Sequence, residues 1–327
     1  MLKTLEQRTL ALRDIDLGDR RFMTSEYFSL ERLISSIRKI GLLQPPVVAK
    51  RGRRWVLVTG WKRVLACQKL GLSFITTSIH DEPDDQKAFL FGVQENLAVR
   101  EFSYLEKAEI LAKLLKFGLP ERKIRRKIMP WLDIPPTKSY LEGHLAIARF
   151  RPEIKRMIVE KNLPFSLAQL LAEFKADDQK AMAPLLWPLG RNKQKEILED
   201  LREISKKTNL APRWILGKKE IRSILKSDKW PPLQKSERVR RALRKLRFPR
   251  FSSWEMDFET AVKKLDWPKD IGLEPAPFFE DDEMTVKFRF RNEEEFMARA
   301  ALIGELASKR ELRELWKHEK KTRKTKA

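Results

Sequence analysis

Residues 55–66 carry the sequence WVLVTGWKRVLA. The first four of them are apolar, and three of the first five are β-branched, which favours a buried strand over residues 55–59. Gly60 follows at once, and the spacing of apolar residues then predicts a helix over residues 61–70 that stops at Gly71. A strand that passes through one glycine into a helix is expected in a domain that mixes α and β structure.

The segments on both sides of residues 55–66 alternate in the same way. Further strands are predicted at residues 10–15, 46–49 and 74–79, and further helices at residues 29–40 and 84–99. Ser29 is the expected N-cap of the first of these helices, and Gly41 is its expected stop. The alternation predicts a small α+β domain over residues 1–100.

The pattern changes after Arg100, where the apolar spacing is helical up to about residue 266. Two short helices at residues 120–131 and 136–150, separated by a turn with prolines, indicate a helix-turn-helix. Residues 284–290 then alternate like a half-buried strand and precede a helix. The expected organisation after the first domain is an all-α helix-turn-helix domain at 101–175, a basic helical region at 176–268, and a small C-terminal β–α unit with a basic tail at 269–327. This unit is expected either to dimerise or to dock on the helices.

The composition is that of a folded, strongly basic protein. Of 327 residues, 42% are hydrophobic, and 69 Lys and Arg against 46 Asp and Glu give a formal net charge of +23. These values exclude global disorder and favour polyanionic partners, because each cation placed against a phosphate releases counterions. The charge is concentrated in residues 218–250, with 13 Lys and Arg against three acids, and in residues 309–326, with nine against three. No apolar run reaches the roughly 18 to 20 residues of a membrane span, and Cys67 is the only cysteine, so disulfides and multi-cysteine zinc sites are excluded.

A candidate anion site lies where the strand at 55–59 meets the following helix. Gly60 permits close approach of a ligand, and the free N–H groups of the first helical turn suit a phosphate. Lys62 and Arg63 would neutralise its charge. The alternative is a pair of solvated cations at a helix start.

Two other segments contain candidate ligand-binding residues. Glu95 and Asn96, near the end of a predicted helix, are oxygen donors of the kind that hold Mg²⁺, or they form an ordinary polar helix end. Gln44, on a proline-stiffened entry to a strand, could touch a ligand or satisfy the backbone of its own loop.

Taken in order, these segments resemble the ParB family of chromosome and plasmid partition proteins. The matching motifs are SIRKIGLLQP at residues 36–45, GWKRVLA at 60–66, ENL at 95–97 and LEKA at 105–108. With the helix-turn-helix, the resemblance covers roughly residues 8–170, about half of the chain. It implies a cytoplasmic protein associated with the nucleoid or with a plasmid.

The resemblance also implies an activity for the first domain. In this family the domain binds CTP with Mg²⁺, and nucleotide binding closes a homodimer into a clamp that slides on DNA. By position, Gly60, Lys62, Arg63 and Asn96 would bind the nucleotide, Glu95 and Asn96 would hold Mg²⁺, and Gln44 and Glu95 would be the catalytic residues of a slow CTPase. Such phosphoryl transfer requires mainly positioning and charge neutralisation.

The family motifs are altered at several positions. Trp61 replaces the glutamate of the G-E-R-R box, Lys62 and Leu65 replace arginines, and Val99 stands where many members carry an arginine, with Arg100 one position later. The N-terminus lacks the tail motif that engages a ParA-type ATPase, so this partner stays an open expectation. Two alternatives remain: a nucleotide-dependent kinase or nuclease on the same fold, and a helix-turn-helix adaptor that needs no nucleotide.

The helix-turn-helix is expected to bind a palindromic site in double-stranded DNA. Side chains near the start of its second helix are of the types that reach base edges and phosphates: Thr137, Lys138, Ser139, Tyr140 and His144. The cations of its first helix would contact backbone phosphates: Arg122, Arg125 and Arg126. The alternative is a helical bundle with a solvated basic face.

Overall fold

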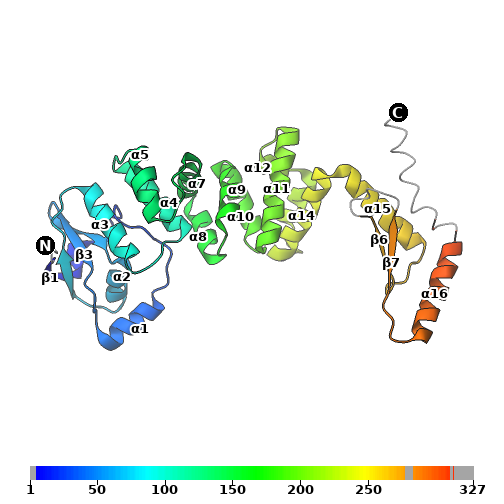
Figure 1. The fold of residues 1–327 in the computed structure, drawn as a ribbon, viewed down its shortest axis with the longest axis horizontal. Helices are drawn as coiled ribbons and strands as arrows, with labels where there is room; N and C mark the ends of the chain where they lie inside the picture. The colour runs from blue at the N-terminus through cyan, green and yellow to red at the C-terminus, as the bar shows by residue number, and fades with distance from the viewer. Residues whose placement is uncertain (1–4, 277–282, 310–311, 313–327) are drawn as a thin grey trace. The chain divides into compact units, whose positions relative to one another are not determined.

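The computed structural model describes residues 5–276, 283–309 and 312. The chain divides into two compact units (Figure 1), an N-terminal unit at Met1–Trp187 and a C-terminal unit at Pro188–Ala327. The predicted basic tail and the end of the last predicted helix lie outside the described residues. In the part of the chain that the structure describes, no helix is long and apolar enough to cross a membrane.

The N-terminal unit is built on a five-stranded mixed sheet with the order β1-β5-β3-β4-β2. Its strands are β1 (Glu6–Ala11), β2 (Ile15–Asp16), β3 (Val47–Arg51), β4 (Arg54–Thr59) and β5 (Phe74–Ile79). β1 pairs antiparallel with β5 and β3 with β4, whereas β3–β5 and β2–β4 are parallel. The strand predicted at residues 10–15 is instead the end of β1, a short 3-10 turn and β2.

Helices cover both faces of this sheet (Figure 1) because its central strands are apolar on both sides. Val48 and Leu57 pack with α1 (Glu31–Ile40) and α2 (Trp61–Lys69), and the core on this side also contains the buried Cys67. Val56 and Val58 face the other way and pack with α3 (Asp85–Leu97) and the helices that follow it. The predicted α+β domain is therefore confirmed.

The start of α1 differs from the prediction. Leu30, not Ser29, is its N-cap residue, and no side chain caps this end. The hydroxyl of Ser29 instead donates to the carboxylate of Glu31, so it is not available to the backbone of the helix. Gly41 ends the helix in the left-handed region, at φ 78°, as expected.

The rest of the N-terminal unit is helical, as predicted. Its helices are α4 (Tyr104–Lys116), α5 (Glu121–Lys123), η2 (Ile124–Ile128), α6 (Met129–Trp131), α7 (Lys138–Ala148), α8 (Pro152–Glu160), α9 (Phe165–Ala172) and α10 (Ala176–Leu186). Ser103 and Glu106 form a reciprocal capping box at the start of α4, and the Thr137 side chain caps α7. α4 packs against α7 and α7 against α9, which holds the second helix of the predicted helix-turn-helix in place.

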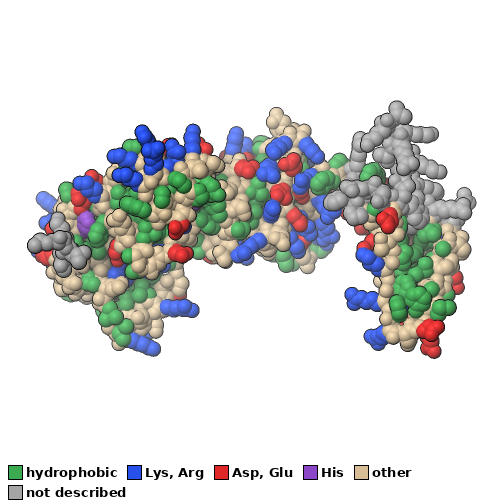
Figure 2. All heavy atoms as spheres, in the orientation of Figure 1, with side chains coloured by type: hydrophobic (Ala, Val, Ile, Leu, Met, Phe, Trp, Pro, Cys, Tyr) green, Lys and Arg blue, Asp and Glu red, His purple; other side chains and the backbone are tan. Residues whose placement is uncertain are grey.

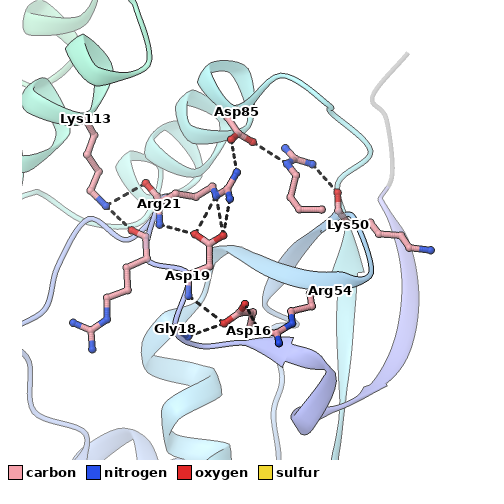
Figure 3. A network of polar contacts seen from close by, with 10 residues as sticks. Asp16, Gly18, Asp19, Arg21, Lys50, Arg54, Asp85 and Lys113 are labelled. Atoms are coloured by element: carbon pink, nitrogen blue, oxygen red, sulfur yellow. Dashed lines mark hydrogen bonds and ion pairs between the residues drawn. The ribbon is translucent and has the colours of Figure 1, made fainter.

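A polar network fixes residues 17–29, which connect β2 to α1 (Figure 3). Arg21 pairs with Asp19 and with Asp85 at the start of α3, and Arg51 of β3 donates to the same Asp85 at 2.8 Å. Lys113 of α4 donates to the carbonyls of Arg20 and Arg21, at 2.6 and 3.1 Å. This connection is therefore attached both to the sheet and to the helical region.

The C-terminal unit contains helices followed by a hairpin and one more helix. These are α11 (Arg191–Thr208), α12 (Pro212–Leu216), α13 (Lys219–Lys226), α14 (Pro232–Arg247), α15 (Pro249–Lys264), β6 (Gly272–Pro275), β7 (Met284–Lys287) and α16 (Glu293–Ser308). β6 and β7 pair antiparallel in a two-stranded sheet. The sequence reasoning located neither α12 nor β6 and gave no bounds for α15.

Candidate functional site

The predicted nucleotide-binding residues lie around one cavity of about 240 Å³ in the N-terminal unit. It lies where β4 ends, α2 begins and α3 ends, and residues 22–33 close its remaining side. Its lining includes every residue that the sequence analysis assigned to nucleotide or magnesium, namely Gln44, Gly60, Lys62, Arg63, Glu95 and Asn96. Segments far apart in the sequence are thus brought together as the motif order predicts.

The backbone at Gly60 makes this junction possible. Gly60 has φ 94° and is the residue before the first turn of α2. A Cβ atom built there would lie 2.7 Å from Cβ of Pro46 and 2.9 Å from its Cα, closer than real Cβ atoms approach. Only glycine fits both the left-handed conformation and the close approach of the two loops.

Arg63 holds the wall of the cavity together. Its guanidinium donates to the carbonyl oxygens of Gln44 and Pro45, at 3.0 and 3.3 Å, and forms an ion pair with Glu95 at 3.4 Å. Its side chain is only 17% exposed. The sequence analysis expected a phosphate ligand here, and the structure shows a residue whose donors already fix the Gln44 loop against α3.

Thr59 and Arg100 complete a polar chain along the cavity. Neither was among the predicted site residues, although Arg100 stands one position after the place of the family arginine. The hydroxyl of Thr59, which is buried at the end of β4, donates to the Glu95 carboxylate at 2.8 Å. Arg100 donates to the amide oxygen of Asn96 at 3.3 Å and pairs with Glu106 of α4 at 3.0 Å. Thr59 could have been identified from the sequence, because it ends an apolar strand and directly precedes Gly60.

Lys62 is the exposed cation of the cavity. Its ammonium lies 5.2 Å from the ring centroid of Phe28, and it forms no ion pair within the described part of the chain. Desolvation and, after it, the charge of Arg100 lower the pKa of Lys62. An anion bound between Lys62 and Arg100 would relieve this repulsion, so the arrangement favours a phosphate.

Trp61, which replaces the glutamate of the family motif, belongs to the core. It is 8% exposed and packs between the sheet and α1 with the other apolar residues of that face. Its indole N–H has no hydrogen-bond partner among the residues that the structure describes. Trp61 also lines the cavity, where it supplies an apolar side chain in place of a carboxylate.

The donors at the end of α3 fit a magnesium ion only in part. Glu95 is one-third exposed and can offer carboxylate oxygens. The amide oxygen of Asn96 accepts from Arg100, and its nitrogen donates to the carbonyl of Gly92 at 2.8 Å. Among the described residues, no three His, Cys, Asp or Glu side chains cluster as a ready metal site. An ion held here would be bound through Glu95 and would take its other ligands from water and a bound phosphate, as Mg²⁺ commonly does.

A second cavity of about 560 Å³ adjoins the first. Thr24, Ser25, Lys62 and Arg100 line both of them. The first cavity alone is smaller than the ~300 Å³ at which small-molecule sites begin, whereas the two together have room for a nucleotide.

The predicted DNA-contacting residues are mostly exposed. Lys and Arg side chains gather over α5 and its neighbours (Figure 2). Arg122, Arg126 and the residues from Thr137 to Tyr140 are exposed, and Lys138 lies 3.6 Å from Glu142. Arg125 is partly buried, and its Nε has no hydrogen-bond partner in the described part of the chain.

His144 does not lie on that surface. It is 4% exposed, its Nδ1 lies 2.7 Å from the carbonyl oxygen of Tyr140, and its ring packs on Phe165 with centroids 4.6 Å apart. Burial lowers its pKa. The expectation that His144 reaches DNA is corrected: it shares the core-facing side of α7 with Leu141 and Ile147.

This fold and cavity define a protein with an N-terminal domain of the ParB type. Residues 3–97 match the family model described as the ParB N-terminal domain. The predicted resemblance to the ParB family is thereby confirmed.

Named relatives match about half of the chain. The chromosome-partitioning protein Spo0J of Thermus thermophilus is 29% identical over 171 residues, 52% of this chain and 57% of that protein. The probable chromosome-partitioning protein ParB of Coxiella burnetii is 24% identical over 159 residues, 48% of this chain and 52% of that protein. A crystal structure of truncated ParB from Caulobacter crescentus complexed with CTP-gamma-S aligns at a TM-score of 0.26 and 22% identity, over 54% of this chain and 97% of that one. The matches span little more than half the length of the first two proteins.

Proposed function

We propose that this chain is a ParB-like protein that binds a palindromic site in double-stranded DNA and acts in chromosome or plasmid partition or in related regulation. In this proposal the N-terminal cavity binds CTP with Mg²⁺ and acts as the nucleotide switch of a DNA clamp. One observation carries the proposal: motif residues from three separate segments, at Gln44, Gly60–Arg63 and Glu95–Asn96, line one cavity. The names of the curated relatives agree with it.

The residues divide the nucleotide contacts among them. Gly60 and the uncapped first turn of α2 would face the phosphates, and Lys62 would neutralise their charge. Glu95, oriented by Thr59, would hold Mg²⁺. Arg63 would act through the Gln44 loop that it fixes, which makes it a positioning residue.

Nucleotide binding is tested by calorimetric titration of the full chain with CTP, ATP, GTP and UTP in the presence of Mg²⁺. CTP is expected to bind selectively, and Lys62→Ala is expected to weaken that binding at least tenfold. Lys69→Ala, which removes an exposed cation from the other end of the same helix, is the matched control and should bind as the wild type does. Absence of binding by all four nucleotides would refute the nucleotide part of the proposal.

DNA recognition is tested by selecting bound duplexes from a random library. An enriched palindrome, lost in a Ser139→Ala/Tyr140→Ala variant, is the expected result. A library that stays random at low and at high salt would refute specific recognition.

The dimer is assigned to the C-terminal elements. The rings of Phe290 and Phe296 lie 5.0 Å apart, and both side chains are exposed, as is that of Met297. A second copy that covers these rings would bury them. Truncation after residue 270 should yield a monomer by light scattering, and a truncated chain that stays dimeric would contradict the assignment.

A nucleotide-independent DNA-binding adaptor is the second candidate. The observation that favours it is the engagement of Arg63 by two carbonyls and Glu95, which leaves fewer free donors for a triphosphate. The titration above separates the two candidates.

A further inference from the structure

The most basic stretch of the chain is not used by the proposed function. It forms α13, α14 and the turn between them in the C-terminal unit, and it holds the concentration of Lys and Arg found at residues 218–250. Figure 2 shows Lys and Arg side chains spread over this part of the molecule. The structure divides these cations into two groups that differ in their partners.

The first group faces α11 and is neutralised. Arg240 pairs with Glu196 at 2.6 Å and with Glu237, Lys193 also pairs with Glu237, and Arg247 pairs with Asp200 at 2.9 Å. The carboxylate of Asp200 is 8% exposed, so this last pair lies inside the seam between the two helices. The ion pairs between α11 and α14 therefore neutralise Glu196, Glu237 and Asp200.

The second group points outward and has no acidic partner among the described residues. We call it the outer basic face; it consists of Lys218, Lys219, Arg222, Lys226, Lys229, Arg238, Arg241 and Lys245, of which all are exposed except the half-buried Arg238. Ile221 of α13 and Val239 and Leu243 of α14 are buried on the opposite sides of the helices. The positive excess of the stretch is therefore presented to solvent.

The spacing of the outer basic face suits a linear array of negative charges. Lys218, Arg222 and Lys226 recur every four residues, which places them on one side of α13 over about 12 Å. Like charges at this spacing destabilise an isolated helix, and a polyanion would relieve that repulsion. Arg238 is held in place by Trp230, whose ring centroid is 3.5 Å from the guanidinium carbon.

We propose that the outer basic face is a second, sequence-independent DNA-binding surface that contacts the phosphate backbone of a duplex. The choice of DNA among polyanions rests on the proposed function. α13 exposes no large apolar side chain in the described structure, so this helix offers neither a wedge for a membrane nor a platform for unstacked bases. Its affinity would come from counterion release, and it would add to recognition by α7 without changing the preferred sequence.

The test uses the full chain and a random-sequence duplex, with binding followed by fluorescence anisotropy over a range of salt concentrations. Arg222→Gln/Lys226→Gln removes two charges from the face. The slope of log K against log salt is expected to become shallower by about 1.8, because each phosphate contact contributes about 0.9. Lys219→Gln/Lys229→Gln, a second pair of exposed positions, should give the same change.

The matched control is Lys195→Gln/Lys206→Gln. These lysines are exposed on α11 of the same unit but lie 3.8 and 3.5 Å from Glu199 and Glu203. The control changes the net charge equally, and its slope should stay that of the wild type. An equal change in control and test variants, or no change in either, would overturn the proposal.

A further outcome concerns the class of polyanion. If the test variants lose affinity for single-stranded RNA and keep it for the duplex, DNA is the wrong ligand. The random duplex contains no preferred site and the assay no nucleotide. Failure of the face is therefore distinguished from failure of the helix-turn-helix or of the nucleotide cavity.

Discussion

Replacement of Gly60 by alanine tests whether the close contact of two loops builds the cavity. The added Cβ would overlap Pro46 at 2.7 Å and would also lie 3.2 Å from Nε of Arg63. Two costs arise: about 1 to 2 kcal/mol for a side chain in the left-handed region, and about 1 to 3 kcal/mol for overpacking. Gly71→Ala is the matched control, because Gly71 has φ 74° at the other end of α2 but nothing within 4 Å of its Cβ position.

The two variants should therefore differ by the overpacking cost alone, about 2 kcal/mol. For a unit of this size that corresponds to about 4 to 8 °C in melting temperature, measured by calorimetry on each purified variant. Gly60→Ala should also weaken nucleotide binding, since the displaced Arg63 loses its hold on the Gln44 loop. Equal melting temperatures for Gly60→Ala and Gly71→Ala would show that the two loops move apart without loss of stability. That result would contradict the overpacking cost assigned to position 60.

Three more predictions follow from the polar groups of the N-terminal unit. Thr59→Val keeps the shape of a buried side chain but removes its hydrogen bond to Glu95. Mg²⁺-dependent nucleotide affinity should therefore fall about tenfold, a loss of about 1.4 kcal/mol, with little change in melting temperature. An unchanged titration would contradict the orienting role of Thr59. His144→Gln should lower the melting temperature through lost packing on Phe165 and leave the salt dependence of DNA binding unchanged, and a changed salt slope would return His144 to the DNA surface. Burial lowers the pKa of Lys113 to about 8, so from about pH 8 to 10.5 the unfolded chain binds a proton that the folded chain lacks. Urea unfolding at pH 7.5 and 9.5 should accordingly show the wild type gaining stability with pH relative to Lys113→Met, and parallel profiles would exclude this linkage.

The sequence was sufficient to predict the N-terminal fold because its signals there are local. Within about a dozen residues, the apolar run predicts β4, Gly60 predicts a turn, and the apolar spacing that follows predicts α2. The strand β5 has the predicted bounds. The Ser29 prediction failed because Glu31, two residues later, competes for its hydroxyl group. The sequence pattern identifies a residue that can cap a helix, and the neighbouring side chain determines whether it does.

The candidate site was only partly predictable for a related reason. The motif order indicated which residues share the cavity, but the partners of Arg63 are backbone carbonyls that reach it only through the tertiary fold. No side-chain pattern encodes such partners. His144 could have been assigned correctly, since Leu141, His144 and Ile147 recur every three residues on the buried side of α7.

Arg100, which stands one position after the place of the family arginine, connects the cavity to the helices that follow. Its guanidinium bonds Asn96 in the cavity and Glu106 in the capping box of α4, and α4 packs against α7. Partial burial of Glu106 favours its neutral form, yet Arg100 and Ser103 hold its pKa below the usual value, so the carboxylate stays charged and the link persists at neutral pH. A ligand that takes the amide oxygen of Asn96 removes one hydrogen bond of Arg100, which also donates to Glu106 and to the carbonyl of Glu101. The free energy of ligand binding therefore depends partly on the ion pair between Arg100 and Glu106 in the first turn of α4. The predicted recognition helix, α7, packs against α4.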